Sequence, residues 1–355
     1  MARAKARAKK PSLTIGKRLI GVGNPPFVIA EIGINHEGDM RKAKRMVRDA
    51  ARAGAECVKF QSHVIEDEMT PVAKKVIPGH TKESIWDIMA RCAFDEDQER
   101  ELKKFTESLG MIYLCTPFSR AAADRLERLG VSAYKIGSGE CNNYPLVEHI
   151  ASFGKPIILS TGMNDLRSIR PAVRILERRK VPYALLHCTS LYPTPYESVR
   201  LGAIAEIARA FPRAVIGSSD HSLGIYTALA AVALGASVIE KHFTSEKRWP
   251  GPDIAISIVP RELRELIIGS RAIFEARGGR KRILAAEKPT IDFAYASVVA
   301  IKNIARGERL TEENIWVKRP GTGEIKAVDF KRLLGKRAER PIKKDSQFTW
   351  KMVAP

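Results

Sequence analysis

Between residues 27 and 244 the chain repeats one pattern, in which a short apolar and β-branched run ends in polar side chains and an amphipathic stretch follows. This alternation is typical of parallel strands joined by helices. Strands are expected at eight such runs, namely 27–35, 57–63, 111–118, 133–140, 156–162, 183–190, 214–222 and 237–244. Eight strands of this kind predict an α/β fold, the (β/α)8 TIM barrel.

The pattern divides the chain into domains. The barrel is expected to occupy residues 19–277, and Ala43, Met46, Val47 and Ala50 mark one buried helix face within it. Residues 278–293 begin with two glycines and three basic residues and are predicted to be a linker. Residues 294–355 are expected to form a small β-rich domain with a strand at 297–301 and a one-turn helix from Thr311.

The first 18 residues form a basic segment in which no acidic residue occurs before Glu31. They are predicted to be a disordered, solvated tail, with an arm that contacts nucleic acid as the alternative. The net charge of +20 favours anionic partners without identifying them. Outside the tail the basic residues lack interleaved aromatic side chains, so no nucleic-acid partner is expected.

The chain contains no run of 18 or more apolar residues and does not start with the apolar stretch of a secretory signal. The sequence therefore predicts a cytoplasmic protein without a membrane partner. Its five cysteines are an odd number, lie far apart and form no C-x-x-C pair. All five are expected to be reduced and structural.

In such a barrel the active site lies at the carboxyl ends of the strands, so the polar residues that end the runs should meet in one pocket. Two lysines and several hydroxyls there could bind a phosphate, two histidines could bind a divalent metal ion, and carboxylates could move protons. The residues concerned include Glu31, Lys59, Gln61, Thr116, Lys135, Ser138, Glu140, Ser160, Ser190, Tyr192, Ser219, His221, Glu240 and His242.

These residues also have structural interpretations. A lysine inside a strand needs an anionic partner because an unpaired buried ammonium costs several kcal/mol. For Lys59 and Lys135 that partner is either a ligand or a structural carboxylate. A single strand-end histidine is more often structural than a metal ligand, but His221 and His242 end successive strands and favour a shared ion. For His36 and His63 a structural role is expected.

Six motifs occurring in order after Phe27 resemble the sialic acid synthase family. They are AEIGINHEG at 30–38, YKIGSGECNN at 134–143, LSTGM at 159–163, HCTSLYPTP at 187–195, SDH at 219–221 and PGPD at 250–253. The resemblance implies a (β/α)8 barrel that joins C3 of phosphoenolpyruvate to the aldehyde carbon of N-acetylmannosamine. Water then adds at C2 and phosphate leaves.

The resemblance also implies roles for single residues. His221 and His242 match ligands of a divalent ion, usually Mn²⁺ or Mg²⁺. The residues that match the phosphoenolpyruvate site are Lys59, Thr116, Lys135, Ser138, Ser160, Ser190 and Ser219. Glu31, Gln61, Tyr192 and Asp253 match positions that contact the amino sugar, and Glu140 matches a carboxylate placed for proton transfer. Ser190 stands where an Asn is expected in the closest bacterial members, and its hydroxyl can still donate one hydrogen bond.

Residues from about Ala294 resemble the family's antifreeze-like C-terminal domain, also called SAF. In that domain Arg319 matches an arginine that reaches the N-acetyl group in the partner subunit's barrel, and Phe293 matches a residue lining the same site. A homodimer with exchanged C-terminal domains is therefore expected. Taken by itself, Arg319 would be interpreted as a solvated surface residue.

The expected product is N-acetylneuraminate. Legionaminate or another nonulosonate made from a 2,4-diacetamido-6-deoxyhexose is the alternative. A second alternative is a synthase that condenses phosphoenolpyruvate with a phosphorylated sugar, such as the related eight-carbon and seven-carbon acid synthases. These share the barrel but lack the C-terminal domain, and its presence here argues against them. A non-catalytic binding protein is disfavoured because Lys59, Lys135, Glu140 and both candidate metal histidines are present.

Overall fold

The computed structural model describes residues 10–79 and 81–354. The chain divides into two compact units between Gly278 and Gly279. Each unit is described by itself below. Among the described residues, no helix is long and apolar enough to cross a membrane.

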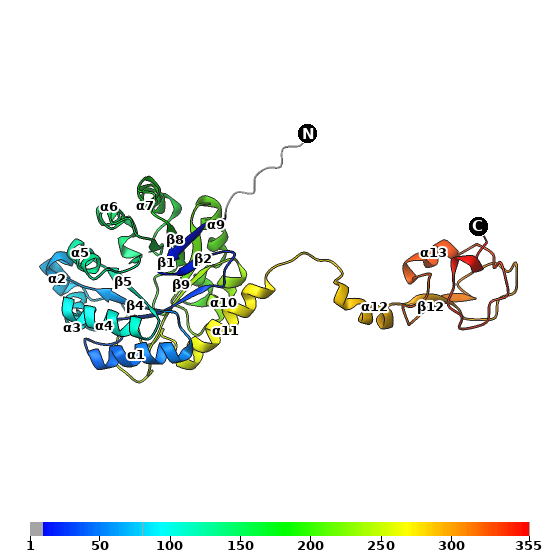
Figure 1. The fold of residues 1–355 in the computed structure, drawn as a ribbon, viewed down its shortest axis with the longest axis horizontal. Coiled ribbons are helices and arrows are strands. Elements are labelled where there is room, and N and C mark those ends of the chain that lie inside the picture. The colour runs from blue at the N-terminus through cyan, green and yellow to red at the C-terminus, as the bar shows by residue number, and fades with distance from the viewer. Residues whose placement is uncertain (1–9, 80, 355) are drawn as a thin grey trace. The chain divides into compact units, whose positions relative to one another are not determined.

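The first unit contains an eight-stranded parallel sheet with the strand order β5-β4-β3-β10-β9-β8-β7-β6 (Figure 1). Strands β5 and β6 at its two ends pack against each other, which closes the sheet into the predicted TIM barrel. The strands are β3 (Phe27–Gly33), β4 (Cys57–Ser62), β5 (Ile112–Pro117), β6 (Tyr134–Ile136), β7 (Ile157–Ser160), β8 (Tyr183–Cys188), β9 (Val215–Asp220) and β10 (Val238–His242).

Side chains of each strand alternate between the interior of the barrel and the surrounding helices. In β3, Phe27 and Ile29 belong to the inner apolar cluster, whereas Val28 and Ala30 belong to the cluster between strands and helices. Continuing this alternation, Glu31 points into the barrel above Ile29. The inner positions are therefore apolar in the lower layers and polar at the carboxyl ends.

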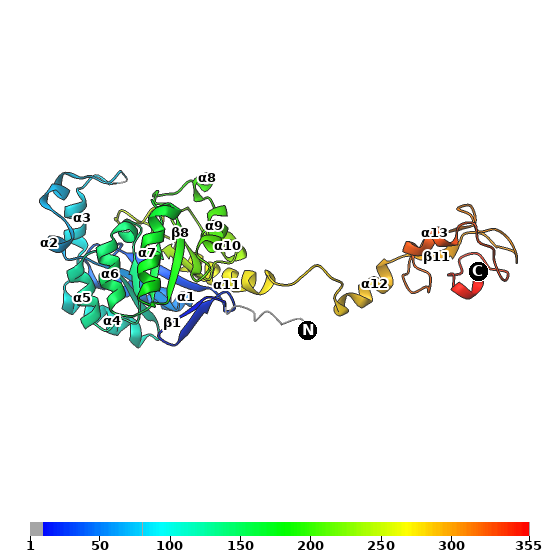
Figure 2. The ribbon, with the colours of Figure 1, turned by 90° about the horizontal axis from the view of Figure 1, so that it is seen from above.

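A β-hairpin closes the bottom of the barrel. Strands β1 (Ser12–Ile15) and β2 (Arg18–Gly21) are antiparallel and lie at one end of the barrel in Figure 2. Leu13, Ile15 and Ile20 are buried in the same cluster as the lower interior residues of the barrel. The prediction that residues 1–18 form a disordered tail is therefore wrong for residues 12–18, which belong to this hairpin. Residues 1–9 of that tail lie outside the described residues.

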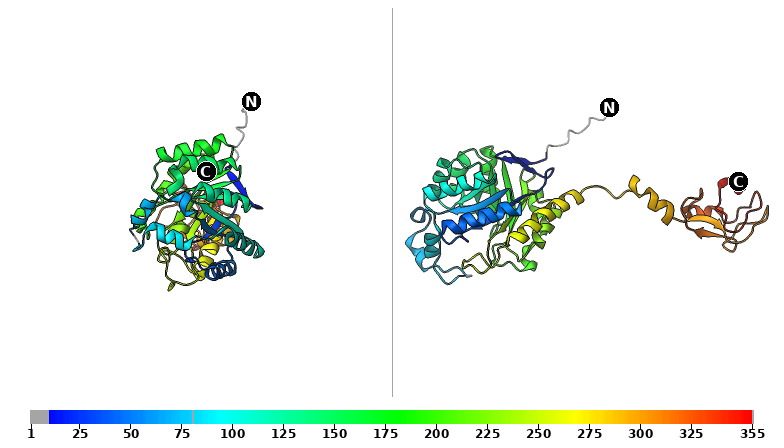
Figure 3. Two further views of the ribbon diagram at one scale, coloured as in Figure 1. Left: turned by 90° about the vertical axis from the view of Figure 1, so that its left-hand side faces the viewer. Right: turned by 60° about the horizontal axis from the view of Figure 1, so that its bottom comes forward.

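Helices surround the strands in the two views of Figure 3. In α1, Ala43, Met46, Val47 and Ala50 are buried as predicted, and Gly54 ends the helix with a φ of 94°. The long helices are α1 (Met40–Ala53), α4 (Glu96–Ser108), α5 (Arg120–Arg128), α6 (Tyr144–Ser152), α7 (Leu166–Arg178), α9 (Gly202–Ala210), α10 (Tyr226–Ala233) and α11 (Pro260–Ala276). Shorter helical elements are α2 (Ile65–Glu68), η1 (Pro71–Lys75), α3 (Ile85–Cys92), η2 (Gly139–Asn142) and α8 (Tyr196–Val199).

The second unit is small, and its core includes Val298, Ala300, Ile315 and Phe348. Strands β11 (Ser297–Ala300) and β12 (Ile315–Lys318) pair antiparallel, which confirms the predicted β-rich character. The remaining elements are η3 (Ala285–Glu287), α12 (Lys288–Ala294), η4 (Ala327–Asp329), α13 (Phe330–Leu333) and η5 (Trp350–Met352).

Two local expectations for this part of the chain differ from the structure. The segment predicted to be a linker carries η3 and most of α12. The helix predicted to start at Thr311 is a turn, in which the Thr311 carbonyl accepts hydrogen bonds from the backbone N–H groups of Asn314 and Ile315. The next residues enter β12, so the turn cannot continue into a helix.

Candidate active site

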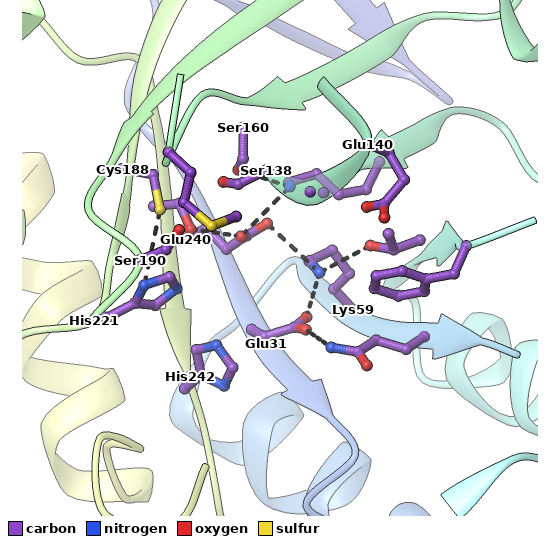
Figure 4. Close-up of a pocket in the computed structure, with 18 of the residues that line it drawn as sticks. Glu31, Lys59, Ser138, Glu140, Ser160, Cys188, Ser190, His221, Glu240 and His242 are labelled. Carbon is purple, nitrogen blue, oxygen red and sulfur yellow. Dashed lines mark hydrogen bonds and ion pairs between the residues drawn. The ribbon is translucent and has the colours of Figure 1, made fainter. Parts of the chain in front are cut away.

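A cavity of about 320 Å³ opens at the carboxyl ends of the barrel strands (Figure 4). Most of the residues predicted from the strand ends line it together, as expected for a barrel of this type. They are Glu31, Lys59, Gln61, Thr116, Lys135, Ser138, Glu140, Ser160, Ser190, Tyr192, Ser219, His221 and His242.

Lys59 lies at the centre of a buried polar network (Figure 4). Lys135 belongs to the same network through Ser160 and Glu240. Lys59 Nζ lies 2.8 Å from Glu31 Oε2 and donates a hydrogen bond of 3.1 Å to Thr116 Oγ1. Lys135 Nζ donates to Ser160 Oγ at 2.7 Å. Glu240 lies between the lysines, with one carboxylate oxygen 3.8 Å from each Nζ. Structural carboxylates therefore pair with both lysines.

These charges determine which groups of the network are ionised. Burial by itself raises the pKa of Glu240, but Lys135 and Lys59 outweigh it and hold that pKa below its usual value. Burial lowers the pKa of Lys59, yet Glu240 and Glu31 raise it overall. Burial raises the pKa of Glu31 to about 7, although Lys59 opposes the change. Burial lowers the pKa of Lys135, although Glu240 opposes the change. The two lysines and the two carboxylates therefore form one network in which the charge of each group depends on the others.

Hydroxyl groups and a glycine shape the side of the cavity formed by β6, β7 and β8. The backbone N–H of Gly162 donates to Ser138 Oγ at 3.0 Å. A Cβ atom at position 162 would collide with Ser190 Oγ and would lie 2.9 Å from Ser138 Oγ and 3.1 Å from Cys188 Sγ. Only glycine leaves room for these three side chains to approach one another. Their hydrogen-bonding groups, with the nearby Lys135, suit a tetrahedral oxyanion such as phosphate.

Glu140 lies on η2 at the edge of the cavity. Burial raises its pKa to about 7, and its Oε2 atom is buried without a hydrogen-bond partner. A carboxyl group whose pKa lies near neutrality can accept and return a proton under physiological conditions. The predicted role in proton transfer is chemically suited to this environment.

The imidazoles of His221 and His242 end adjacent strands, with ring centroids 5.3 Å apart. The carbonyl oxygen of Thr189 lies 3.0 Å from His221 Nδ1, which places a proton there and leaves Nε2 as a possible metal ligand. Nδ1 of His242 is buried without a hydrogen-bond partner, 3.6 Å from Asp253 Oδ2. This donor set fits a divalent ion.

The remaining ligands of such an ion would come from elsewhere. Among residues 10–79 and 81–354, no group of three or more His, Cys, Asp or Glu side chains is arranged to hold an ion by itself. Burial keeps the pKa of His242 well below its usual value, whereas Cys188 outweighs burial and raises that of His221. A metal ion at this pair would therefore displace a proton from His221.

Asp253 does not line the cavity, and Phe293 and Arg319 belong to the second unit. Asp253 lies in the loop after β10, is buried and approaches His242. Phe293, on α12, is 63% exposed, and Arg319 follows β12 in the second unit. The predicted roles of these three residues therefore stay predictions.

The cavity is also lined by Glu240, to which the sequence analysis gave a place at a strand end but no role, and by Cys188, which was expected to be structural. Strand alternation could have found both, because Glu240 lies two residues after the interior Val238 and Cys188 two residues after the interior Leu186. The five cysteines are free and buried, as expected for reduced thiols. Cys188 also lies against His221, with Sγ 3.8 Å from Nδ1.

Comparisons with known proteins show the family of the chain. Residues 46–282 match the NeuB family and residues 295–354 match the SAF domain. N,N'-diacetyllegionaminic acid synthase from Campylobacter jejuni is 40% identical over 90% of this chain and 97% of its own length. Human N-acetylneuraminate-9-phosphate synthase is 35% identical over 95% of both chains.

Among solved structures, the N-acetylneuraminic acid synthetase of Leptospira borgpetersenii in complex with citrate has a TM-score of 0.73 and 34% identity. The match covers 79% of this chain and 95% of that chain. These findings confirm the resemblance to the sialic acid synthases and the assignment of the C-terminal domain. With a barrel and a cavity of the expected composition, the chain belongs to the NeuB family of sialic acid and related nonulosonate synthases.

Proposed function

We propose that the protein condenses phosphoenolpyruvate with the open-chain form of an N-acylated amino sugar. C3 of phosphoenolpyruvate bonds to the aldehyde carbon, whose oxygen takes up a proton. Water adds at C2, and the C–O bond to phosphate breaks, giving a nine-carbon 2-keto acid and phosphate. The observation that carries this proposal is the burial of Lys59 and Lys135 in one cavity, because two desolvated ammonium groups suit a substrate with two anionic groups.

Lys59 and Lys135 would neutralise the phosphate and carboxylate of phosphoenolpyruvate. The hydroxyl-rich wall would provide hydrogen bonds to the same substrate from Thr116, Ser138, Ser160, Ser190 and Ser219. The proximity of Ser160 to Lys135 and of Thr116 to Lys59 supports this assignment. The phosphate and carboxylate of the substrate would replace part of the ion pairing that Glu31 and Glu240 provide to the two lysines.

The amino sugar would bind beside this anion site. Glu31, Gln61, Tyr192 and Asp253 are proposed to contact its hydroxyl and amide groups. Glu140 would exchange the proton that the new C–C bond and the added water require. Its raised pKa supports this role, because a carboxyl near pH 7 can act in both directions.

His221 and His242 are proposed to hold Mn²⁺ or Mg²⁺. When bound, such an ion supplies Lewis-acid polarisation of the aldehyde oxygen. Replacing His221 with Ala should abolish both turnover and the binding of Mn²⁺ measured by electron paramagnetic resonance. A matched control is His149→Ala, because His149 pairs with Asp124 on the outer helices. Unchanged Mn²⁺ binding by the His221 variant would reject the metal site.

N-acetylmannosamine is the proposed sugar, with N-acetylneuraminate as the product. A second candidate is a 2,4-diacetamido-6-deoxyhexose, favoured by the 40% identity to the Campylobacter relative named as a legionaminic acid synthase. Phosphate release should be measured with both sugars and with N-acetylmannosamine 6-phosphate, at equal phosphoenolpyruvate. The sugar with the highest kcat/KM identifies the substrate class. No phosphate release with any of them would reject the proposed reaction.

The protein is further proposed to act as a homodimer with exchanged C-terminal domains, in which Arg319 and Phe293 serve the partner's barrel. Mixing two inactive variants tests this exchange directly. His221→Ala has a defective barrel but an intact Arg319, and Arg319→Ala has the reverse. If the arginine acts across subunits, re-equilibrated mixtures should recover about a quarter of the wild-type activity, because half the dimers are mixed and each has one complete site. If the mixture stays inactive, the exchange is rejected.

A further inference from the structure

His63 connects a cavity residue to a carboxylate outside the cavity. It follows β4 and is buried, and its ring stacks on Phe118 with centroids 4.7 Å apart. Its Nδ1 atom lies 2.7 Å from Glu68 Oε2 on α2, and its Nε2 atom lies 3.1 Å from Gln61 Oε1. The Gln61 amide nitrogen donates to Glu31 Oε1 over a long 3.5 Å contact. A continuous chain of polar contacts therefore runs from Glu68 to Glu31.

These contacts can determine which end of the Gln61 amide faces the cavity. The two ends of a carboxamide have nearly the same shape, but one donates hydrogen bonds and the other accepts them. A carboxylate only accepts, so Glu68 fixes a proton on Nδ1 of His63. The contact between Nε2 and the Gln61 oxygen is a hydrogen bond when Nε2 carries the proton, because an amide oxygen only accepts. The donor end of Gln61 then faces Glu31 and the cavity.

We propose that His63, held by Glu68 and by stacking on Phe118, is a positioning residue that fixes the Gln61 amide for recognition of the amino sugar. This role rests on the proposed function above, and it replaces the structural role expected for His63 from the sequence. Other buried histidines differ in their partners. His36 Nδ1 lies 3.1 Å from the Gly38 N–H, and His187 Nε2 lies 2.6 Å from the Val199 carbonyl.

The contacts predict an effect confined to one substrate. Lys59 and Lys135 donate to Thr116 and Ser160, whereas the ring nitrogens of His63 contact Glu68 and Gln61. Loss of the His63 contact should therefore weaken binding of the amino sugar and leave phosphoenolpyruvate binding intact. A purely structural role would instead change the KM of both substrates, or the stability alone.

Two amide substitutions separate the two ring nitrogens. In the His63→Asn variant, the amide nitrogen of the new side chain can replace Nδ1 and keep the contact with Glu68, but it cannot reach Gln61. The longer side chain of His63→Gln can replace Nε2 and keep the contact with Gln61. We expect His63→Asn to raise the KM of the amino sugar about 10-fold, which is the loss of one hydrogen bond in a polar site. His63→Gln should stay within about 3-fold of wild type, and both should keep the KM of phosphoenolpyruvate within about 2-fold.

Controls make each outcome decisive. His149→Asn alters a half-buried histidine outside the cavity, which pairs with Asp124 at 2.7 Å and packs on Phe153. This substitution should change the KM of neither substrate. If His63→Asn does not fold, Glu68→Ala serves instead, because it leaves the stacked ring unheld and should raise the KM of the sugar alone. Equal KM values for the Asn and Gln variants, or parallel increases for both substrates, would overturn this role. No turnover by the wild-type enzyme with any amino sugar would overturn the proposed function, and this role with it.

Discussion

Lys59 Nζ and Glu240 Oε2 lie 3.8 Å apart in the interior of the barrel, where both side chains are almost completely buried. The other oxygen of Glu240 lies at the same distance from Lys135, so one carboxylate balances two ammonium groups. A ligand carrying two or more negative charges would compete with Glu240 for both lysines. Replacing Glu240 alone would therefore change the balance of charge in the cavity.

Glu240→Gln should destabilise the ligand-free protein and increase its stabilisation by phosphoenolpyruvate. Removing one partner of a buried ion pair costs about 3–5 kcal/mol, because the remaining charge is left uncompensated. Phosphoenolpyruvate would supply the missing negative charge and should raise the thermal midpoint of the variant more than that of wild type. Thermal unfolding with and without phosphoenolpyruvate measures both effects. Glu265→Gln, at an exposed site on α11, is the control, and equal protection of both variants would contradict the prediction.

Glu140→Gln should lower kcat by about 10²–10⁴-fold, the usual contribution of a positioned acid or base. Because burial raises the pKa of Glu140 to about 7, the ionised form accumulates only above that pH. The wild-type rate should therefore rise as the pH passes through about 7. Phosphoenolpyruvate binding, followed by thermal shift, should survive the substitution. A variant with wild-type kcat would remove Glu140 from proton transfer.

The same pKa shift predicts a change in stability. The pKa of Glu140 rises on folding from its usual 4.5 to about 7, so its contribution to stability is greatest below pH 4.5 and is lost as the pH rises through about 7. Glu140→Gln should consequently make the stability curve shallower between these values. The slope should not vanish, because burial also raises the pKa of Glu31 and of Glu99 to about 7.

The barrel and most of the candidate site could be predicted because strand patterns and strand-end chemistry are local in sequence. Lys59 and Lys135 were identified as unusual residues in apolar runs, and both line the cavity. Glu240 and Lys241 are adjacent polar residues in the same run, and hydropathy does not distinguish them. Strand alternation does, because adjacent residues point to opposite faces.

Other features depend on tertiary contacts that no local pattern encodes. The hairpin of residues 12–21 has strands of only four residues. Its side chains Leu13 and Ile20 are buried because they pack against the apolar residues at the bottom of the barrel interior. A second example is Trp249, which lies in the loop between β10 and α11. Its ring packs near Lys42 Nζ and the Arg45 guanidinium of α1, at 5.4 and 5.1 Å from the centroid. Such cation–π contacts depend on the packing of a loop against a distant helix.

Gly162→Ala should weaken phosphoenolpyruvate binding selectively. The added Cβ would collide with Ser190 Oγ and crowd Ser138 and Cys188, so the hydroxyl groups that shape the anion site must separate. We expect the KM of phosphoenolpyruvate to rise at least about 10-fold, the effect of losing one or two hydrogen bonds to a charged ligand. Gly139→Ala is the matched control, because this cavity glycine has no atom within 4 Å of an added Cβ. Equal KM values for the two variants would show that the crowding is absorbed elsewhere.

Lys241→Met should destabilise the fold without changing substrate binding. Lys241 pairs with Asp220 on the neighbouring strand at 3.0 Å and is fully buried, but it does not line the cavity. Asp220 also accepts hydrogen bonds from the Ser222 N–H and the Thr227 hydroxyl, so its carboxylate remains buried when the lysine is removed. The free energy of unfolding should fall by about 3–5 kcal/mol in urea titrations.

The contrast with Lys59→Met provides the test of this assignment. Lys59 points into the cavity, so its loss should abolish phosphoenolpyruvate binding, whereas Lys241→Met should keep the KM of phosphoenolpyruvate within about 2-fold at temperatures where it is folded. If both substitutions raised that KM equally, Lys241 would act on the substrate and the division of β10 into an inner and an outer face would be wrong. If Lys241→Met lost no stability, its ion pair with Asp220 would be dispensable, because the hydrogen bonds from Ser222 and Thr227 would suffice to hold the buried carboxylate.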